Sequence, residues 1–149
     1  MIGVVFDSSA IVTLLVQDRG WRGIQSVLTN SEVDAVMAGP ALTEVIAVAR
    51  RKGNRSSGAQ IATALSALGL RVEHPTDRDL VRAPQLIEVS EANPGPRNPR
   101  GGEKATLSLG DALILAIAER LAFRVLTYDT YWKWMVDEGV LALHVVVPE

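Results

Sequence analysis

The sequence predicts an α/β fold, a three-layer α/β/α sandwich with a mostly parallel central sheet. Short apolar runs that are typical of strands alternate along the chain with longer segments whose apolar residues recur at helical spacing. Such alternation indicates parallel strands joined by right-handed helical crossovers. The strand segments, such as IGVVF, are continuously apolar, which is expected when helices cover both faces of a sheet.

The predicted elements follow one another in a regular order. Strands are expected over 2–6, 34–39, 70–75, 123–127 and 141–147, and helices over 8–17, 21–30, 40–52, 56–69, 76–92, 109–122 and 130–139. Pro40 marks a helix start, because proline is favoured at the first helical position, and Gly69 marks a helix end. Pro84 lies inside a predicted helix and is a candidate break in it.

Composition narrows the class of protein. The 149 residues are 48% hydrophobic and 21% charged, as in globular chains, and we expect one domain over 1–149. No apolar run approaches the ~20 residues that cross a bilayer, and the N-terminus lacks the positive charge of a signal peptide. The absence of cysteine excludes thiolate chemistry, and we expect a cytoplasmic location. The net charge of −2 leaves any nucleic-acid contact to local basic patches.

Four acidic residues stand near predicted strand ends. Asp7 directly follows the first strand, and Asp129 follows the fourth. Asp111 begins the apolar helix that leads into the fourth strand, and Glu44 begins a helix that leaves the second. Because the carboxyl ends of parallel strands meet at one edge of a sheet, all four side chains are expected at that edge.

So many like charges in one place imply a bound cation. Neighbouring carboxylates repel, and several ionise together only around a positive ion. Hard oxygen ligands in this number suit Mg²⁺ or Mn²⁺ and not zinc. Such a site supports attack of a metal-activated water on a phosphodiester. The hypothesis is therefore that Asp7 and the other three acids are metal ligands.

Each acid also has a structural interpretation. Asp7 and Asp129 are candidate N-cap or turn residues, because an aspartate before a helix accepts a backbone N–H. Glu44 is a candidate first-turn acid that complements the helix dipole. Asp111 stands three residues after Ser108, which is the spacing of a capping box. The convergence of all four acids at one sheet edge favours the metal site over four independent structural roles.

Four segments, in the expected order, resemble motifs of the PIN-domain ribonucleases, in particular the VapC toxins of VapBC toxin–antitoxin systems. They are VFDSSAIVTLL, ALTEVIAV, LSLGDALILAIAERL and RVLTYDTYW, and the resemblance covers essentially the whole chain. The third is the most specific, because apolar helices that begin S-x-G-D-A are distinctive. The resemblance implies a catalytic, metal-binding quartet of acids, with Mg²⁺ or Mn²⁺ bound by Asp7, Glu44, Asp111 and Asp129.

The same resemblance carries further expectations. Thr127 matches a hydroxyl position that supports the site, and Ser9, or its neighbour Ser8, is expected to support Asp7. The resemblance implies an endoribonuclease that cleaves single-stranded or looped RNA as the toxin of a type II toxin–antitoxin pair. The expected partners are the RNA, a cognate antitoxin and a second copy of the chain in a homodimer. The proline- and glycine-rich stretch at 92–104 departs from the family pattern.

Basic and aromatic residues are candidate substrate contacts in this hypothesis. Arg97, Arg100 and Lys104 supply local positive charge ahead of the third motif and could bind RNA phosphates, although solvated charge is the simpler interpretation. Trp132 and Trp134 closely follow the last acid and could stack on a base. Aromatic residues in a short terminal helix are more often core or interface residues.

Two other classes of function compete with the ribonuclease. An aspartate after the first strand also marks enzymes that form an aspartyl-phosphate, but the second aspartate of one such pattern is replaced by Ser9. The chain could instead be a catalytically silent PIN-like module for binding or dimerisation, although the presence of all four acids argues against a decayed site. Binding of a divalent ion would distinguish the nuclease from the silent module.

Overall fold

The computed structural model describes residues 1–96 and 104–148, which form a five-stranded sheet and seven helices. The strands are β1 (Ile2–Phe6), β2 (Val33–Ala38), β3 (Arg71–Glu73), β4 (Arg124–Leu126) and β5 (Val145–Val146). The helices are α1 (Ser8–Leu15), α2 (Trp21–Thr29), α3 (Gly39–Arg51), α4 (Gly58–Ala67), α5 (Asp77–Ala92), α6 (Leu109–Leu121) and α7 (Thr130–Asp137). Every predicted element is present. No helix in the described part of the chain is long and apolar enough to span a membrane.

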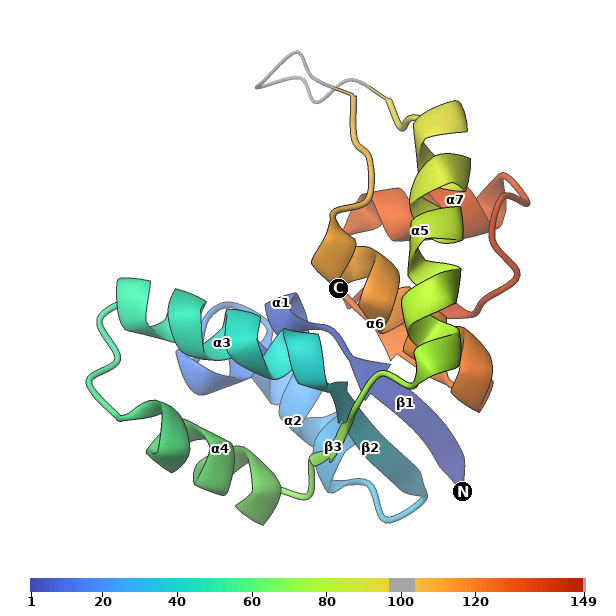
Figure 1. Ribbon diagram of the computed structural model, residues 1–149. Helices are drawn as coiled ribbons and strands as arrows, with labels where there is room; N and C mark the ends of the chain where they lie inside the picture. The colour runs from blue at the N-terminus through green and yellow to red at the C-terminus, as the bar shows by residue number, and fades with distance from the viewer. Residues whose placement is uncertain (97–103, 149) are drawn as a thin grey trace.

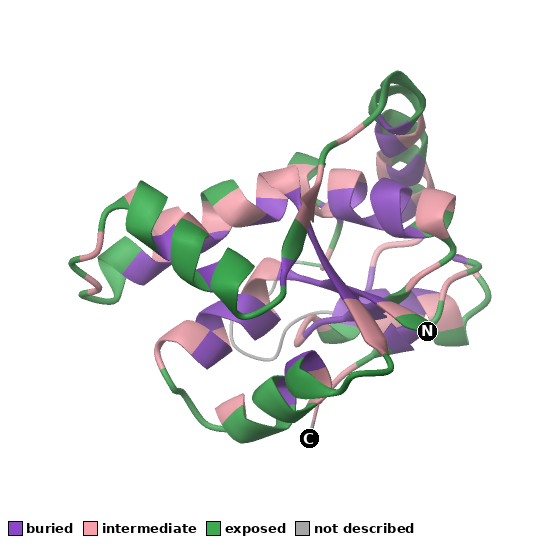
Figure 2. Ribbon diagram, turned by 90° about the horizontal axis from the view of Figure 1, so that it is seen from below, coloured by how far each residue is buried: buried purple, intermediate pink, exposed green. Residues whose placement is uncertain are grey.

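The sheet is parallel throughout and has the strand order β3-β2-β1-β4-β5. Right-handed crossovers place the helices that lead outward to β2 and β3 on one face, and the helices that lead to β4 and β5 on the other. In Figure 1, α1–α4 accordingly group on one side of the sheet and α5–α7 on the other. The central strands are largely buried between them (Figure 2). The predicted α/β/α sandwich is confirmed.

The strand order creates a topological switch point between β1 and β4. From β1 the chain moves outward to β2 and β3, and then crosses back to β4 on the other side of β1. Crossovers that diverge from two neighbouring strands leave a crevice at their carboxyl ends, where ligands bind in open α/β sheets. The backbone N–H of Asp7 donates to the carbonyl of Leu126 at 2.9 Å, which extends the pairing of β1 with β4 to this end. The first and last sequence motifs therefore meet at the switch point.

Helix α6 has more buried residues than any other described helix, as its nearly continuous apolar sequence predicts. It packs on β1, β2 and β4 and against α3 and α5. Its buried residues are Ala112, Ile114, Leu115, Ala116, Ile117 and Ala118. Because α6 leads directly into the amino end of β4, its own first turn lies toward the carboxyl ends of the strands. This arrangement brings Asp111 to the same side of the sheet as Asp7.

Pro84 does not break helix α5, which continues without interruption to Ala92. A proline inside a helix removes the N–H that would bond to the carbonyl four residues earlier. That carbonyl belongs to Leu80, and both Leu80 and Pro84 are exposed, so water can bind the freed carbonyl. The expected break is wrong because the proline lies on the solvent-facing side of the helix.

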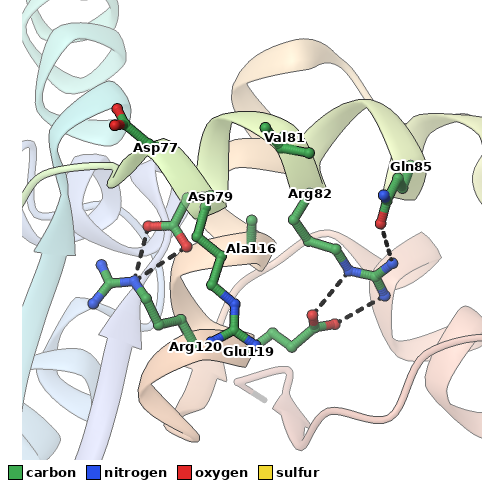
Figure 3. A pocket seen from close by; sticks show the side chains of 9 residues that line it. Asp77, Asp79, Val81, Arg82, Gln85, Ala116, Glu119 and Arg120 are labelled. Atoms are coloured by element: carbon green, nitrogen blue, oxygen red, sulfur yellow. Dashed lines mark hydrogen bonds and ion pairs between the residues drawn. The ribbon is translucent and has the colours of Figure 1, made fainter.

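Ion pairs join α5 to α6 around a cavity of about 710 Å³ (Figure 3). Asp79, which is 1% exposed, accepts a hydrogen bond from Arg120 at 2.9 Å, and Arg120 also pairs with Glu73 at 3.1 Å. Arg82 pairs with Glu119 at 2.9 Å. Because each of these charges has a partner of opposite sign, we interpret this cavity as part of the packing between two helices and not as the candidate active site.

Candidate active site

Asp7 is a buried carboxylate, 4% exposed, that directly follows β1. Its Oδ2 accepts hydrogen bonds from the hydroxyls of Ser9 and Thr127, each at 2.8 Å. Asp7 occupies the N-cap position of α1, but its side chain makes no capping bond to the helix. The N-cap interpretation of this carboxylate is therefore wrong. Its side chain is held by one hydroxyl from the same segment, Ser9, and by one from a distant part of the chain, Thr127.

The same two hydroxyls join the segment after β1 to the segment after β4. Thr127 Oγ1 accepts the N–H of Asp129 at 2.9 Å, and Ser9 Oγ accepts the N–H of Tyr128 at 3.1 Å. Since each hydroxyl donates its single hydrogen to Asp7, the 3.5 Å separation between the two hydroxyl oxygens is a packing contact. Ser9 and Thr127 thus position both the Asp7 carboxylate and the backbone that leads to Asp129.

Asp129 is half-buried at the N-cap of α7. Its Oδ1 accepts the N–H of Tyr131 at 3.0 Å, which confirms the capping interpretation for this residue. Burial raises the pKa of Asp129 above its ordinary value, and the negative charge of Asp7 adds to this effect, whereas backbone N–H donors oppose it. One carboxylate therefore caps a helix and also belongs to a cluster of negative charge.

Asp111 also combines two roles. Ser108 Oγ accepts the N–H of Asp111 at 3.1 Å, and Asp111 Oδ2 accepts the N–H of Ser108 at 3.2 Å, so the predicted capping box is confirmed. Burial raises the pKa of Asp111 to about 6. The bonds from Ser108 oppose this shift, and the charges of Asp7 and Asp129 add to it. Three of the four predicted acids are therefore close enough to repel one another.

Glu44 reaches the site through the packing of helices. It lies in the second turn of α3, and the first turn holds no acid, so the helix-dipole interpretation is wrong. Ser8 Oγ donates to Glu44 Oε2 at 2.8 Å and lies 3.4 Å from Asp7 Oδ1. A Cβ built on Gly110 would lie 2.4 Å from Glu44 Oε1. Glu44 therefore lies between the first turns of α1 and α6, in space that the glycine leaves open.

Two of these contacts go beyond the sequence prediction. The sequence assigns hydroxyl support to Asp7, whereas Ser8 bonds more closely to Glu44. Gly110 has no predicted role, although it is the glycine of the S-x-G-D-A motif and precedes a predicted ligand, Asp111. Both contacts join helices that are far apart in the sequence, so neither follows from local spacing.

The donor chemistry of the site suits a hard divalent cation. Among residues 1–96 and 104–148, no lysine or arginine pairs with any of the four carboxylates. Clustered carboxylate oxygens are the ligands that Mg²⁺ and Mn²⁺ prefer. Within the same residues, no three acidic or histidine side chains are grouped closely enough to share one ion in their present orientations. Each carboxylate points instead to a hydroxyl or a backbone N–H, so an ion would have to compete with these hydrogen bonds.

The basic and aromatic residues that the sequence singles out differ in accessibility. Lys104 is exposed, whereas Arg97 and Arg100 lie outside the described residues. Trp132 is fully buried, which confirms a core role for it. Trp134 is half-buried. Of these two tryptophans, only Trp134 has surface that a ligand can reach.

The raised pKa of Asp111 predicts how stability depends on pH in the metal-free protein. The ordinary pKa is 3.8 and the folded value is about 6, so the folded state binds this proton more tightly than the unfolded state does. The stabilisation of the folded state by this proton is complete below the pKa of the unfolded state and is lost as the pH rises through the pKa of the folded state. Asp111→Asn removes the effect and keeps an oxygen that can accept the N–H of Ser108. We expect this variant to melt at a higher temperature than the wild type near neutral pH.

Thermal unfolding in a chelator, from about pH 4 to about pH 7, measures this difference. The melting temperature of the wild type should fall relative to that of Asp111→Asn as the pH rises through this range. Glu88→Gln alters an exposed acid on α5 and serves as the control. Its melting temperature should depend on pH in the same way as that of the wild type. Parallel curves for Asp111→Asn and the wild type would contradict the raised pKa.

Comparison with solved structures reveals several proteins of the same fold. A toxin–antitoxin complex from Klebsiella pneumoniae contains a chain that is 19% identical, with a TM-score of 0.64 and 98% of each chain covered. The sarcin–ricin loop cleaving toxin VapC20 from Mycobacterium tuberculosis is 16% identical, with a TM-score of 0.59, and the match covers 82% of this chain and 86% of that one. VapBC-1 from nontypeable Haemophilus influenzae matches at 14% identity, a TM-score of 0.64 and 98% coverage of each chain. At identities this low, the comparison shows a common fold alone.

Sequence comparison identifies the family. No curated protein matches the chain. The family model of the PIN domain matches residues 4–135, which include Asp7, Glu44, Asp111 and Asp129. The chain therefore belongs to the PIN domain family.

Proposed function

We propose that the protein is a metal-dependent endoribonuclease and the toxin of a type II toxin–antitoxin pair. The observation that carries this proposal is the cluster at the switch point, where the buried carboxylate of Asp7 lies near enough to the half-buried carboxylates of Asp111 and Asp129 for their charges to interact. Membership of the PIN domain family supports a nuclease. The similar solved structures support the toxin role, since they include toxin–antitoxin complexes and a toxin that cleaves the sarcin–ricin loop.

The chain's own residues have distinct parts in this proposal. The proposed ligands of Mg²⁺ or Mn²⁺ are the four carboxylates, Asp7, Glu44, Asp111 and Asp129. When bound, the ion supplies an activated water and offsets the charge that develops on the scissile phosphate. Ser9 and Thr127 orient the Asp7 carboxylate through two bonds to Oδ2, and Ser8 orients Glu44. Because burial raises the pKa of Asp111 to about 6, metal affinity should increase as the pH rises past this value.

The proposed partners follow from the same function. The substrate is RNA, and Arg97, Arg100 and Lys104 are proposed to contact its phosphates. A cognate antitoxin and a second copy of the chain are the proposed protein partners, and the proposed location is the cytoplasm. The solved toxin–antitoxin complexes of the same fold support an antitoxin partner.

The alternative is a catalytically silent PIN-like module for binding or dimerisation. One observation favours it: within the described residues, no three potential ligands are grouped closely enough to share an ion as they stand. The nuclease proposal requires the carboxylates to exchange some of their present hydrogen bonds for metal bonds. Measurements of metal binding and RNA cleavage therefore separate the two functions.

Cleavage of a total-RNA preparation is the direct test of the nuclease. We expect fragments with Mg²⁺ or Mn²⁺ and none with a chelator. Asp7→Asn removes a proposed ligand and should lower the rate by at least about 100-fold, because changes to residues that merely support ligands already cost about 10–100-fold. Electrophoresis of the RNA after timed incubation measures the rate.

Two controls make this cleavage experiment decisive. Glu88→Gln removes an exposed acid on α5 and should cleave at the wild-type rate. Circular dichroism should show that Asp7→Asn is folded. Cleavage by Asp7→Asn at the wild-type rate would exclude Asp7 from the mechanism, and the absence of metal-dependent cleavage by the wild type would favour the silent module.

Metal binding should also stabilise the folded protein. An ion that binds only the folded state at one hundred times its Kd adds about 2.7 kcal/mol to the free energy of unfolding. We therefore expect Mg²⁺ or Mn²⁺ to raise the melting temperature of the wild type, and to raise that of Asp7→Asn much less. Differential scanning calorimetry at increasing metal concentration measures the shift. Equal shifts for the two proteins would argue against a site that includes Asp7.

Gly110→Ala tests the position of Glu44 without removing any carboxylate. The added Cβ would lie 2.4 Å from Glu44 Oε1, and the end of a glutamate side chain can move away without disturbing the fold. Since displacement of a catalytic group by about 1 Å can cost about 100-fold in rate, we expect a large loss of cleavage with little change in melting temperature. Rate measurements and thermal unfolding of the same preparation check both outcomes.

Gly23→Ala is the matched control for this substitution. Gly23 lies in helix α2, and a Cβ built there meets no atom within 4 Å. The control should cleave at the wild-type rate and be equally stable or more stable by up to about 1 kcal/mol, because alanine favours a helix over glycine. Wild-type cleavage by Gly110→Ala would show that the placement of Glu44 does not matter.

A further inference from the structure

A cavity of about 490 Å³ lies directly beside the acidic cluster, along helix α7. Its lining residues are Pro96, Ala105, Asp129, Thr130, Tyr131 and Trp134. Asp129 belongs to both the cavity wall and the acidic cluster, since Thr127 Oγ1 accepts the N–H of Asp129 at 2.9 Å and donates to Asp7 Oδ2 at 2.8 Å. The volume is within the range of about 300–1,000 Å³ that is typical of small-molecule sites. The cavity therefore has the size of a ligand site and adjoins the proposed reaction centre.

The aromatic wall of this cavity is held rigidly. The hydroxyl of Tyr131 donates to the carbonyl of Asn93 at 2.8 Å and contacts Ser90 Oγ at 2.9 Å. A Cβ built on Gly95 would lie 2.5 Å from the ring of Tyr131, so the backbone at Gly95 packs directly on this ring. Tyr131 is buried as a result, and its orientation is determined by contacts with segments far from α7 in the sequence.

Trp134 stacks on this fixed ring and lines the cavity. The centroids of the Tyr131 and Trp134 rings are 5.8 Å apart, and the ring planes differ by 19°. Trp134 is half-buried, in contrast to Trp132, which has no exposed surface. A stacked, partly exposed indole next to a carboxylate offers a flat apolar surface together with a hydrogen-bond acceptor.

We propose that this cavity is a base subsite, which binds one unstacked nucleobase of a single-stranded RNA against Trp134. The proposal rests on the nuclease function proposed above and specifies how its substrate is selected. Every base has a flat face that stacks on an aromatic side chain, and the amino groups of bases can donate hydrogen bonds to the carboxylate of Asp129. Because Asp129 joins the cavity to the acidic cluster, the bound base belongs to a nucleotide next to the scissile phosphate.

This subsite predicts a preference for unpaired RNA. A base within a duplex is stacked on both faces and paired along its edge, so it cannot enter a lateral cavity unless it leaves the helix. A base in a loop or a single strand pays little of this cost. The subsite thus restricts cleavage to unpaired positions, independently of any contact with the phosphates.

Tryptophan fluorescence tests binding separately from cleavage. The probe is a single-stranded RNA of about ten nucleotides, a length that covers the usual site size of single-strand binders. In a buffer that contains Ca²⁺, this RNA is titrated into three proteins: the wild type, Trp134→Phe and Trp21→Phe. We expect quenching in the wild type and in Trp21→Phe, which alters an indole outside the cavity, and nearly none in Trp134→Phe. Equal quenching of the wild type and Trp134→Phe, or no quenching of either, would overturn the proposal.

Cleavage kinetics provide the second arm of the test. Replacing a stacking aromatic with alanine weakens binding by about 5- to 150-fold, so Trp134→Ala should raise KM by this factor with a smaller change in kcat. Trp134→Phe keeps a ring and should restore most of the loss. A merely structural role for Trp134 predicts a lower melting temperature and an unchanged KM.

An abasic scan of the substrate links the residue to one base. Substrates that lack one base at successive positions near the cut should include one that the wild type binds more weakly, and Trp134→Ala should show no additional loss with that substrate. Equal losses in both proteins at every position would overturn the subsite. The failure of the nuclease proposal looks different, because the wild type would then cleave no RNA with any metal, whereas the fluorescence titration would still report on Trp134.

Discussion

The hydrogen bonds from Ser9 and Thr127 to the buried carboxylate of Asp7 hold the candidate site together. A carboxylate that is 4% exposed is expensive to bury unless donors replace its lost water, and two hydroxyls at 2.8 Å provide such donors. Because these hydroxyls also accept backbone N–H groups after β4, the arrangement exists only when β4 lies next to β1. The strand order and the acidic site are therefore parts of one constraint.

Two buried aspartates in this chain show how differently the fold can compensate a charge. Asp79 is paired with Arg120, which also binds Glu73, so the charges between α5 and α6 are balanced within the protein. Asp7 has only hydroxyl donors among the described residues, and its charge adds to the raised pKa of Asp111. Uncompensated negative charge is costly to the folded protein and attractive to a cation. This contrast distinguishes a structural charge network from a candidate binding site.

Helix α7 contributes two kinds of group from one short segment. Its N-cap, Asp129, extends the acidic cluster, and the helix itself carries the stacked rings of Tyr131 and Trp134. Tyr131 and Trp134 are three residues apart and so lie on the same side of the helix. Because Asp129 is the N-cap of this helix, one element positions the carboxylate relative to the aromatic wall. The distance between the proposed reaction centre and the proposed base subsite is thus set by local helix geometry, and the hydroxyl of Tyr131 anchors the helix to distant segments.

The sequence by itself determined the order of the elements, the α/β/α architecture and the meeting of Asp7 and Asp129 at one sheet edge, because periodicity and parallel topology are sufficient for these. Tertiary structure alone decided the details that depend on distant neighbours. Glu44 joins the site by the packing of α3 against α1 and α6, and Trp134 differs from Trp132 in burial although both lie on α7. A periodic pattern specifies which face of a helix is apolar, but a side chain's hydrogen-bond partner can be more than one hundred residues away, as Thr127 is from Asp7.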